Sequence, residues 1–473
     1  MERDVPRNAE NGMVVALNKS NEIVCLHPGS KTGRSVCGRP IVRGGNIVCK
    51  ENSSHIIPLA QIMKLVESNP ALSKIYHQEM AELCVTNAQP ENSLFKEEEI
   101  TVNGGSLLRY FDEIKDFCFY PEHGEVAFVG KNHKGSCVVR NGEKGPIYEH
   151  VIYFGYTPDG KLIYGVAQPP DWFTVIDGKE QKHFNYIDQF SFRASMKGDV
   201  AYFGKVDKEA FLMLNGQQFG PLYKKLSYLA FSPAGELAYV TDDLSRQRMI
   251  SRGAIGEAFE WVGEPCFSPD GEVAYIARNG KNWFIVCNGK TLEIDFVESV
   301  GELVFSQEGK LAYVVEKIAK NEKRKIVICG GKEQPFEYWM GLYFTPQGEL
   351  VYGARDPSSC KCFVVRDGAV LEPEYHVQIA VSGDGKVAFV AETEDNINRG
   401  YVVCENQVEP VWGGMIRGLD FTKDNKLVYM VDGNQKRVCY GRTISSPYEE
   451  ICLISDKSFI AKRGKKYFLC TCR

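Results

Sequence analysis

The sequence predicts an all-β protein made of many short strands joined by tight turns. Glycine is abundant, with 45 residues among 473, and aromatic residues make up 11% of the chain. One turn-forming pattern recurs at nearly constant spacing through most of the sequence, whereas a helical pattern is confined to residues 56–85. Composition and periodicity together favour a tandem array of strand units.

The recurring pattern is a four-residue turn, as in SPDG at residues 268–271. Proline presets the backbone for such a turn, and the final glycine accepts a positive φ angle. Successive copies lie 36 to 40 residues apart, with a mean of about 37.6. The narrow spread indicates a tandem repeat whose turns end at Gly124, Gly160, Gly198, Gly235, Gly271, Gly309, Gly348, Gly385 and Asn425.

Each repeat predicts four antiparallel strands. The first precedes the turn, the second follows it as in KLAYVV (310–315), and the third ends in Asn-Gly, Gly-Gly or Asp-Gly, as in KIVICGG (325–331). Such pairs are the strongest short hairpin signals. A fourth, more polar run closes on an aromatic residue. One such unit cannot bury both of its faces, so we expect the units to stack as blades of a β-propeller.

The chain ends predict a shared blade. Residues 100–114 have the form of third and fourth strands, and residues 452–470 have the form of first, second and third strands. Combining them would remove free sheet edges, with one copy of the third strand displaced. Nine complete units and this shared one predict about ten blades in one ring, with the propeller at 100–473 and a separate N-terminal region at 1–99.

The stretches at 267–290 (FSPDGEVAYIARNGKNWFIVCNGK) and 138–165 resemble the WD-like β-propeller repeats that carry Phe-Ser-Pro-Asp-Gly and Asp-Gly-Lys signatures. Such repeats occur in the Tol-system periplasmic propeller and in propeller domains of the prolyl-oligopeptidase family. The resemblance covers about residues 100–473 and implies the fold but hardly the function. No export signal is seen, which disfavours the Tol-like role, and no Gly-x-Ser-x-Gly element is present, which removes the peptidase module.

Residues 1–99 do not follow the repeat. Cys25, Cys37 and Cys49 recur every twelve residues, which predicts a small three-strand meander. With His27 they could instead supply four zinc ligands, although the usual paired spacing is missing. Residues 56–85 predict a helical pair broken at Pro70, and 86–99 a linker. We expect no cofactor, and we expect the cysteines within repeat strands, such as Cys287, Cys329, Cys404 and Cys439, to be free thiols.

Charge and hydropathy exclude several partner classes. The net charge is −5, from 56 basic and 61 acidic residues spread along the chain, so we expect no nucleic acid partner. No apolar run of 18 or more residues occurs, so we expect no membrane partner. A cytoplasmic location is the expectation.

The predicted function is binding rather than catalysis, because nucleotide-binding, metalloprotease and hydrolase motifs are absent. The segments between second and third strands vary most, and they should share one rim of the ring with the connections between blades. The expected function is a non-enzymatic scaffold whose rim holds a protein or peptide. The alternative is an enzyme or small-ligand receptor at the mouth of the central channel, where first strands would bring carboxylates and histidines together. Large aromatic and guanidinium groups dominate interface energetics, so the candidate rim anchors are Trp172, Arg246, Arg248, Trp283, Trp339, Arg355, Arg399 and Trp412.

Overall fold

The computed structural model describes seven short strands between residues 3 and 58, by their backbone alone, and residues 95–472 apart from 244, 320–321, 359–360, 374, 393–399, 406, 410–414, 434, 442 and 456. Within these residues the fold is all β, and the helical element is a single 3₁₀ turn, η1 (Leu107–Arg109). None of the helical structure described is long and apolar enough to cross a membrane. The chain forms two compact units, one of residues 97–370 with 452–470, the other of residues 1–96 and 371–451 with 471–473.

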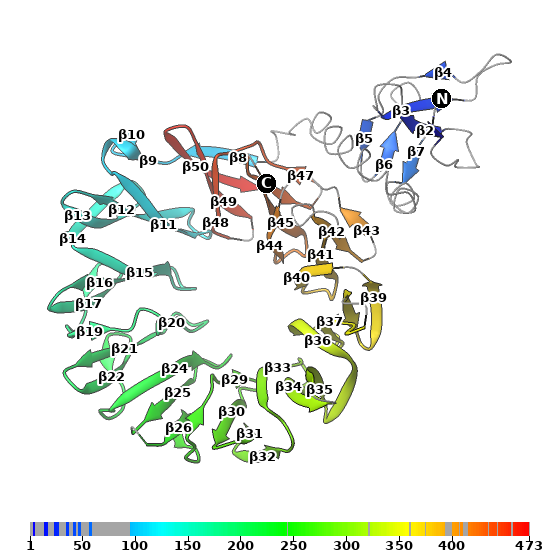
Figure 1. The fold of residues 1–473 in the computed structure, drawn as a ribbon. Coiled ribbons are helices and arrows are strands. Elements are labelled where there is room, and N and C mark those ends of the chain that lie inside the picture. Colours follow the sequence, from blue (N-terminus) through cyan, green and yellow to red (C-terminus); the bar gives the residue numbers. More distant parts are fainter. Residues whose placement is uncertain are drawn as a thin grey trace. The chain divides into compact units, whose positions relative to one another are not determined.

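The larger unit contains consecutive antiparallel sheets, which we number as blades. In Figure 1 these sheets follow one another along an arc, with the first strand of each sheet on the concave side. Blades 1 and 2 are four-stranded: β11 (Glu113–Tyr120), β12 (Glu125–Asn132), β13 (Gly135–Arg140), β14 (Glu143–Tyr148); β15 (His150–Tyr156), β16 (Leu162–Gln168), β17 (Asp171–Ile176), β18 (Lys179–Glu180).

Blades 3 to 5 repeat this order, but in blades 3 and 5 the first strand is split into two short pieces. Their strands are β19 (Tyr186–Ile187), β20 (Arg193–Ala194), β21 (Val200–Val206), β22 (Glu209–Leu214), β23 (Gln217–Gln218); β24 (Lys225–Phe231), β25 (Leu237–Asp242), β26 (Gln247–Ser251), β27 (Ala254–Ile255); β28 (Trp261–Val262), β29 (Cys266–Phe267), β30 (Val273–Asn279), β31 (Asn282–Cys287), β32 (Lys290–Ile294).

Blades 6 and 7 share one long strand, β36, and so form a continuous seven-stranded sheet. Its first half is the fourth strand of blade 6 and its second half is the first strand of blade 7. The strands are β33 (Ser299–Phe305), β34 (Leu311–Ala319), β35 (Glu322–Cys329), β36 (Lys332–Phe344), β37 (Leu350–Arg355), β38 (Cys362–Arg366) and β39 (Ala369–Pro373).

The second unit holds blades 8 and 9 and the N-terminal strands. Blades 8 and 9 consist of β40 (Tyr375–Val381), β41 (Val387–Glu392), β42 (Gly400–Cys404), β43 (Gln407–Glu409); β44 (Met415–Phe421), β45 (Leu427–Asp432), β46 (Arg437–Tyr440), β47 (Thr443–Ile444). The N-terminal strands form two sheets: β1 (Arg3–Asp4), β2 (Val14–Leu17), β3 (Ile23–His27), β4 (Ser35–Val36); β5 (Ile41–Arg43), β6 (Asn46–Val48), β7 (Ile56–Pro58).

The cysteine segments of the N-terminal region fall in two sheets rather than in one three-strand meander. Cys25 lies in β3, which pairs with β4 just before Cys37, whereas β6 ends just before Cys49 and belongs to the other sheet. Residues 56–58 are a strand, and the rest of the predicted helical pair lies outside the described residues, as do Cys37, Cys49 and the side chains of Cys25 and His27. The zinc alternative therefore stays a prediction.

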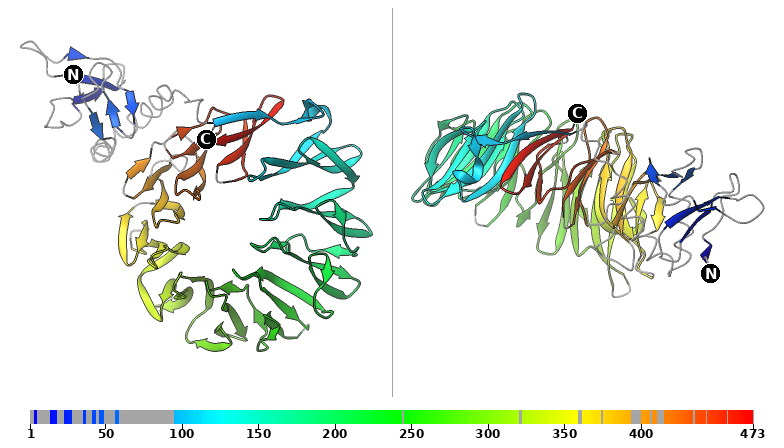
Figure 2. Two further views of the ribbon diagram at one scale, coloured as in Figure 1. Left: turned by 180° about the vertical axis from the view of Figure 1, so that it is seen from behind. Right: turned by 90° about the horizontal axis from the view of Figure 1, so that it is seen from above.

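The two ends of the repeat region share one sheet, as predicted. This composite blade has the order β48 (Glu450–Leu453), β49 (Ser458–Arg463), β50 (Lys466–Cys472), β8 (Phe95–Glu99). The Ile100 N–H donates to the Tyr467 carbonyl at 2.9 Å, and Lys466 Nζ lies 2.7 Å from a carboxylate oxygen of Glu99. Both views of Figure 2 show the pale blue β8 beside the red C-terminal strands.

The identity of the closing strand differs from the prediction. The fourth strand is 95–99, within the predicted linker, and not part of 100–114. Residues 101–106 form a separate small hairpin, β9 (Thr101–Val102) with β10 (Gly105–Ser106), which accounts for the surplus copy of the third strand. The closing strand is the last strand of its sheet and its side chains after Phe95 are exposed, so it tolerates the polar sequence FKEEE, which carries no alternating apolar pattern.

The turn predictions are confirmed at atomic detail. All nine turn residues have positive φ, from +58° at Asn425 to +90° at Gly385. In eight of the nine turns a buried serine or threonine precedes this residue by three positions. Its hydroxyl accepts the backbone N–H of the residue directly after the turn, as when Lys310 N–H donates to Ser306 Oγ at 3.0 Å. The third-to-fourth-strand turns also follow expectation, since Asn141 and Gly142 both have the positive φ of a type I′ turn.

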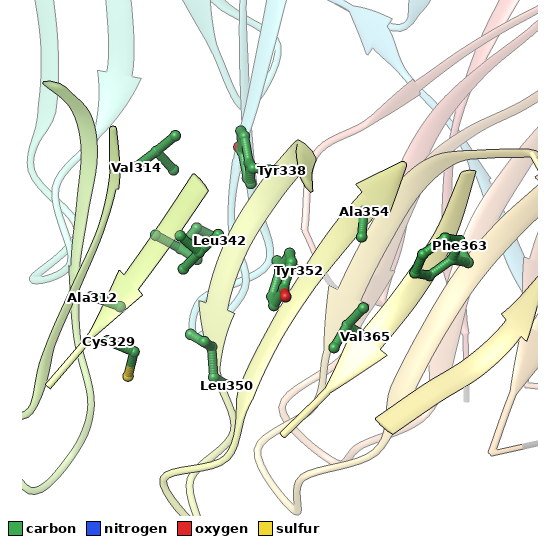
Figure 3. Close-up of a cluster of buried hydrophobic side chains, with 11 residues drawn as sticks. Ala312, Val314, Cys329, Tyr338, Leu342, Leu350, Tyr352, Ala354, Phe363 and Val365 are labelled. Carbon is green, nitrogen blue, oxygen red and sulfur yellow. The ribbon is translucent and has the colours of Figure 1, made fainter. Parts of the chain in front are cut away.

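The apolar core lies between consecutive blades rather than within single ones. Figure 3 shows one such layer, in which Val314 of blade 6 and Leu342, Tyr352 and Phe363 of blade 7 gather with their neighbours. Equivalent clusters join each successive pair of blades in the larger unit, and one joins blades 8 and 9. This arrangement confirms that a blade buries its faces by stacking. As expected, Cys287, Cys329, Cys404 and Cys439 do not form disulfide bonds.

Candidate functional site

The predicted rim corresponds to one end of the blades in the larger unit. Because successive strands are antiparallel, the connections between second and third strands lie at the same end of each blade as the connections between blades. We call this end the connection rim. In the larger unit it carries the predicted anchors Trp172, Arg246, Arg248, Trp283, Trp339 and Arg355. Arg399 and Trp412 lie outside the described residues.

A connected group of side chains on the connection rim lies on blade 5. Trp261, Arg278 and Trp283 are direct cross-strand neighbours on β28, β30 and β31, and we call them the tryptophan row. The two indole rings meet edge to face at 5.9 Å, and the Arg278 guanidinium lies 5.4 Å from the Trp283 ring centroid. The Trp283 indole N–H donates to the Glu298 carbonyl at 2.9 Å, which anchors the ring while Arg278 stays exposed.

The neighbouring loop of blade 4 places a second arginine beside this row. Arg246 Nη1 donates to the side-chain oxygen of Asn279 at 2.8 Å, from blade 4 to blade 5. Its loop is shaped by Asp243, whose carboxylate accepts the Ser245 hydroxyl at 2.7 Å and the backbone N–H groups of Ser245 and Arg246. The Ser245 hydroxyl, then these N–H groups, lower the pKa of Asp243 to about 2. The loop therefore gains this stabilisation above about pH 4 and loses it as the pH falls towards 2.

Phe296 is the most exposed large side chain near this group. It lies in the connection between β32 and β33, is 95% exposed and has a positive φ of 57°. A bulky residue in that conformation is strained, and a ring so exposed contributes no hydrophobic burial to the stability of the fold. The carbonyl that anchors Trp283 belongs to Glu298, two residues further on. The rim of blades 4 and 5 thus presents two half-buried indoles, of which Trp283 also packs against the core between blades 5 and 6, together with two exposed guanidinium groups and an exposed phenyl ring.

The other predicted anchors do not join this group. Trp172 packs against Tyr186 at 5.0 Å and lies partly in the core between blades 2 and 3. Arg248 is partly buried and points back to its own blade, where it donates to the Gly256 carbonyl at 3.4 Å. On blade 7, Trp339 is 47% exposed and Arg355 lies 5.5 Å from its ring. The structure therefore divides these anchors among three places on the connection rim.

Sequence reasoning missed Trp261, Arg278 and Phe296. Trp261 could have been found, because it lies at the connection between blades 4 and 5. The predicted Trp339 lies at the corresponding connection two repeats later, between blades 6 and 7. Gly263 allows the close packing of Trp261, since a Cβ there would come within 2.8 Å of the indole ring. Arg278 and Phe296 carried no such signal. Their importance follows from strand register and from exposure.

The concave side of the larger unit shows a second pattern. The first strands of blades 1, 2, 4, 6 and 7 carry an irregularity seven or eight residues before the turn glycine, and the first strands of blades 3 and 5 are interrupted at the same position. At this position Tyr228 and Glu302 have positive φ, of 51° and 44°. β-Bulges of this kind re-aim side chains and are frequent beside functional sites. The residues at this position in blades 1 to 7 are Asp116, Ile152, Phe190, Tyr228, Glu264, Glu302 and Gly341.

Two carboxylates of this series have defined partners. Glu302 accepts the hydroxyl of Tyr338 at 2.6 Å, and burial together with this hydrogen bond raises the pKa of Tyr338. Glu264 of blade 5 lies 4.0 Å from the Arg193 guanidinium of blade 3, so this pair spans the intervening blade 4. The partners of these two first-strand carboxylates are thus a tyrosine and an arginine, and no histidine occupies this position in blades 1 to 7.

Comparisons with known proteins assign no family. No family model and no curated protein matches the chain. Among solved structures it is similar to the tricorn protease, at 11% identity and a TM-score of 0.32 over 67% of this chain and 41% of that one. It is also similar to a streptogramin B lyase, at 11% identity and a TM-score of 0.28 over 81% and 99%, and to virginiamycin B lyase from Staphylococcus aureus, at 13% and 0.26 over 60% and 94%. The chain spans about two fifths of the tricorn protease, and TM-scores this low carry no argument about activity.

Proposed function

We propose that the protein is a non-enzymatic platform that binds a protein or peptide on the connection rim of blades 4 and 5. The observation that carries this proposal is the tryptophan row with the exposed Phe296 beside it. Tryptophan and arginine are the residues most enriched among those that dominate interface energies. Exposed apolar rings bounded by polar groups are typical of interaction sites.

Charge also favours a peptide partner at this place. Arg246 engages an amide oxygen and Arg278 an aromatic face, so their positive charges are available to carboxylates of a partner. Guanidinium groups bind carboxylates in a bidentate manner, which adds direction to the contact. A segment that combines acidic and apolar residues would complement this surface.

Replacing rim residues should weaken partner binding without unfolding the protein. We expect Arg278→Ala and Phe296→Ala each to lower the affinity for the partner by about tenfold or more, as for residues at the centre of an interface. The partner would be recovered by affinity purification from the native host and its Kd measured against each variant.

Ile255→Ala is the matched control. Ile255 is 69% exposed and lies on β27 beside the turn between third and fourth strands, at the opposite end of the blade. Its replacement should leave the Kd unchanged. Equal recovery and equal affinity for wild type, Arg278→Ala and Phe296→Ala would contradict the rim assignment.

The proposed rim belongs to a larger closed arrangement of blades. We infer that the composite blade and blades 1 to 9 close into a single ring of ten blades, acting in the cytoplasm, where the free thiols stay reduced. The order of sheets and the shared blade support this inference. Electron microscopy of the purified protein should show one ring with ten peripheral densities. Two separate bodies, or an open arc, would contradict it.

A further inference from the structure

A distinct group of exposed side chains lies on the concave side of blades 3 to 5. It consists of Phe190, Arg193, Tyr228 and Glu264, and we call it the concave site. Tyr228 lies at the bulge of blade 4, and Phe190 and Glu264 lie at the equivalent place in blades 3 and 5, between the two pieces of the first strand. Arg193 follows Phe190 by three residues. The site is separate from the connection rim and does not depend on partner binding there.

Arg193 is held in a fixed orientation by its own backbone. Its Nη1 donates to the carbonyls of Phe190 and Phe192, both at 2.9 Å. These two bonds use both protons of that nitrogen, which leaves three of the five guanidinium donors directed elsewhere. The side chain is 41% exposed. A preorientated guanidinium with open donors is suited to an anionic group such as a carboxylate.

Glu264 supplies the opposite charge next to this guanidinium. Its carboxylate lies 4.0 Å from Arg193 Nη2 and its side chain is 64% exposed. This separation is longer than a hydrogen bond, so neither group saturates the other. Glu302 on the neighbouring blade adds a second exposed carboxylate at the equivalent position. A purely anionic ligand would meet these carboxylates, and a purely cationic one would meet Arg193.

Two exposed aromatic residues occupy equivalent positions in blades 3 and 4. Phe190 is 78% exposed, and its position is set by its N–H, which donates to the Asp188 carboxylate at 3.0 Å. Tyr228 is 39% exposed and belongs to blade 4, which lies between the blades of Arg193 and Glu264. Exposed aromatic faces beside a charge pair favour a ligand with an apolar or aromatic group.

We propose that the concave site binds a small zwitterion of the amino-acid class with an aromatic or large apolar side chain. The ligand's carboxylate takes the open donors of Arg193, its ammonium group takes Glu264, and its side chain lies against Phe190 and Tyr228. Both charges and the ring are needed, because each protein group satisfies a different part of the ligand.

Calorimetric titration of the full-length protein tests this proposal with four probes. L-phenylalanine carries all three groups, 3-phenylpropanoate lacks the ammonium, 2-phenylethylamine lacks the carboxylate, and L-alanine lacks the ring. Saturable binding of L-phenylalanine is expected, with each of the other three at least about tenfold weaker. Absence of saturable phenylalanine binding, or equal affinity for all four probes, would overturn it.

Two glutamate variants complete the test. Glu264→Gln keeps the shape of an exposed side chain and should weaken phenylalanine binding by about tenfold while changing 3-phenylpropanoate binding little. Glu293→Gln, on exposed β32, should leave both unchanged. Thermal unfolding of each variant checks the fold. Unaltered phenylalanine affinity in Glu264→Gln would refute the assignment, whereas partner binding at the rim should be the same in both variants.

Discussion

Phe128→Ala is expected to lower the free energy of unfolding by about 3–5 kcal/mol, the usual cost of removing a buried phenylalanine ring. Phe128 on β12 is 1% exposed, and its ring meets Phe111 edge to face at 6.0 Å and Phe117 at 5.5 Å. Its cluster also contains Ile460, Tyr467 and Leu469, from the far end of the chain. The substitution would leave a cavity between blade 1 and the composite blade. Urea denaturation followed by tryptophan fluorescence measures the loss.

Phe296→Ala is the natural control for this substitution. It removes the same atoms from a side chain that is 95% exposed, so stability should change by no more than about 0.5 kcal/mol. A similar loss for both substitutions would mean that Phe128 is not buried between the two blades.

Removing the closing strand, β8, is the second change expected to have a large effect on stability. A chain that begins at residue 100 should be less stable than one that begins at residue 95 by about 3 kcal/mol or more, because β8 contributes the fourth strand of the composite blade. Its loss removes several backbone hydrogen bonds, each worth about 1 kcal/mol net, and the buried Phe95, worth about 1.5–3 kcal/mol. Calorimetric unfolding of the two truncated chains, which differ by five residues, measures this difference.

A variant that removes two charges separates the contribution of the backbone pairing of β8 to stability from the contribution of its ion pairs. Glu97 and Glu99 pair with Arg463 and Lys466 at the surface, so replacing both glutamates by alanine should cost at most about 1 kcal/mol per pair. If that variant were as unstable as the chain beginning at residue 100, the backbone pairing of β8 would not be the main contribution. Equal stability of the two truncated chains would show that β8 does not close the blade.

Much of the fold could be predicted because the strands and turns of each repeat depend on interactions between residues that are close together in the sequence. The turn at Gly309 needs only a residue that accepts a positive φ and a hydroxyl three residues earlier, at Ser306, both within a few positions of the chain. The alternating second and third strands are equally local signals. These features determined where most strands of the repeat begin and end.

The closing strand could not be predicted in this way. The sequence FKEEE has neither alternation nor β-branched residues, and it becomes a strand by pairing with β50. Its ion-pair partner Arg463 lies 366 residues away from Glu97. No window of sequence contains both halves of that interaction.

The candidate sites, too, could be predicted in part from the sequence and in part only from the structure. Composition and loop position were enough to mark Trp283, Arg246 and Trp339 as rim residues, because variable loops of a repeat array lie at one end of the blades. The tryptophan row needed strand register, which sets Arg278 between Trp261 and Trp283. The pairing of Arg193 with Glu264 needed two blades that flank a third. The sequence by itself determined the repeating blade, since turn chemistry is local. The tertiary structure alone decided which residues meet across blades, since those distances depend on how the sheets stack.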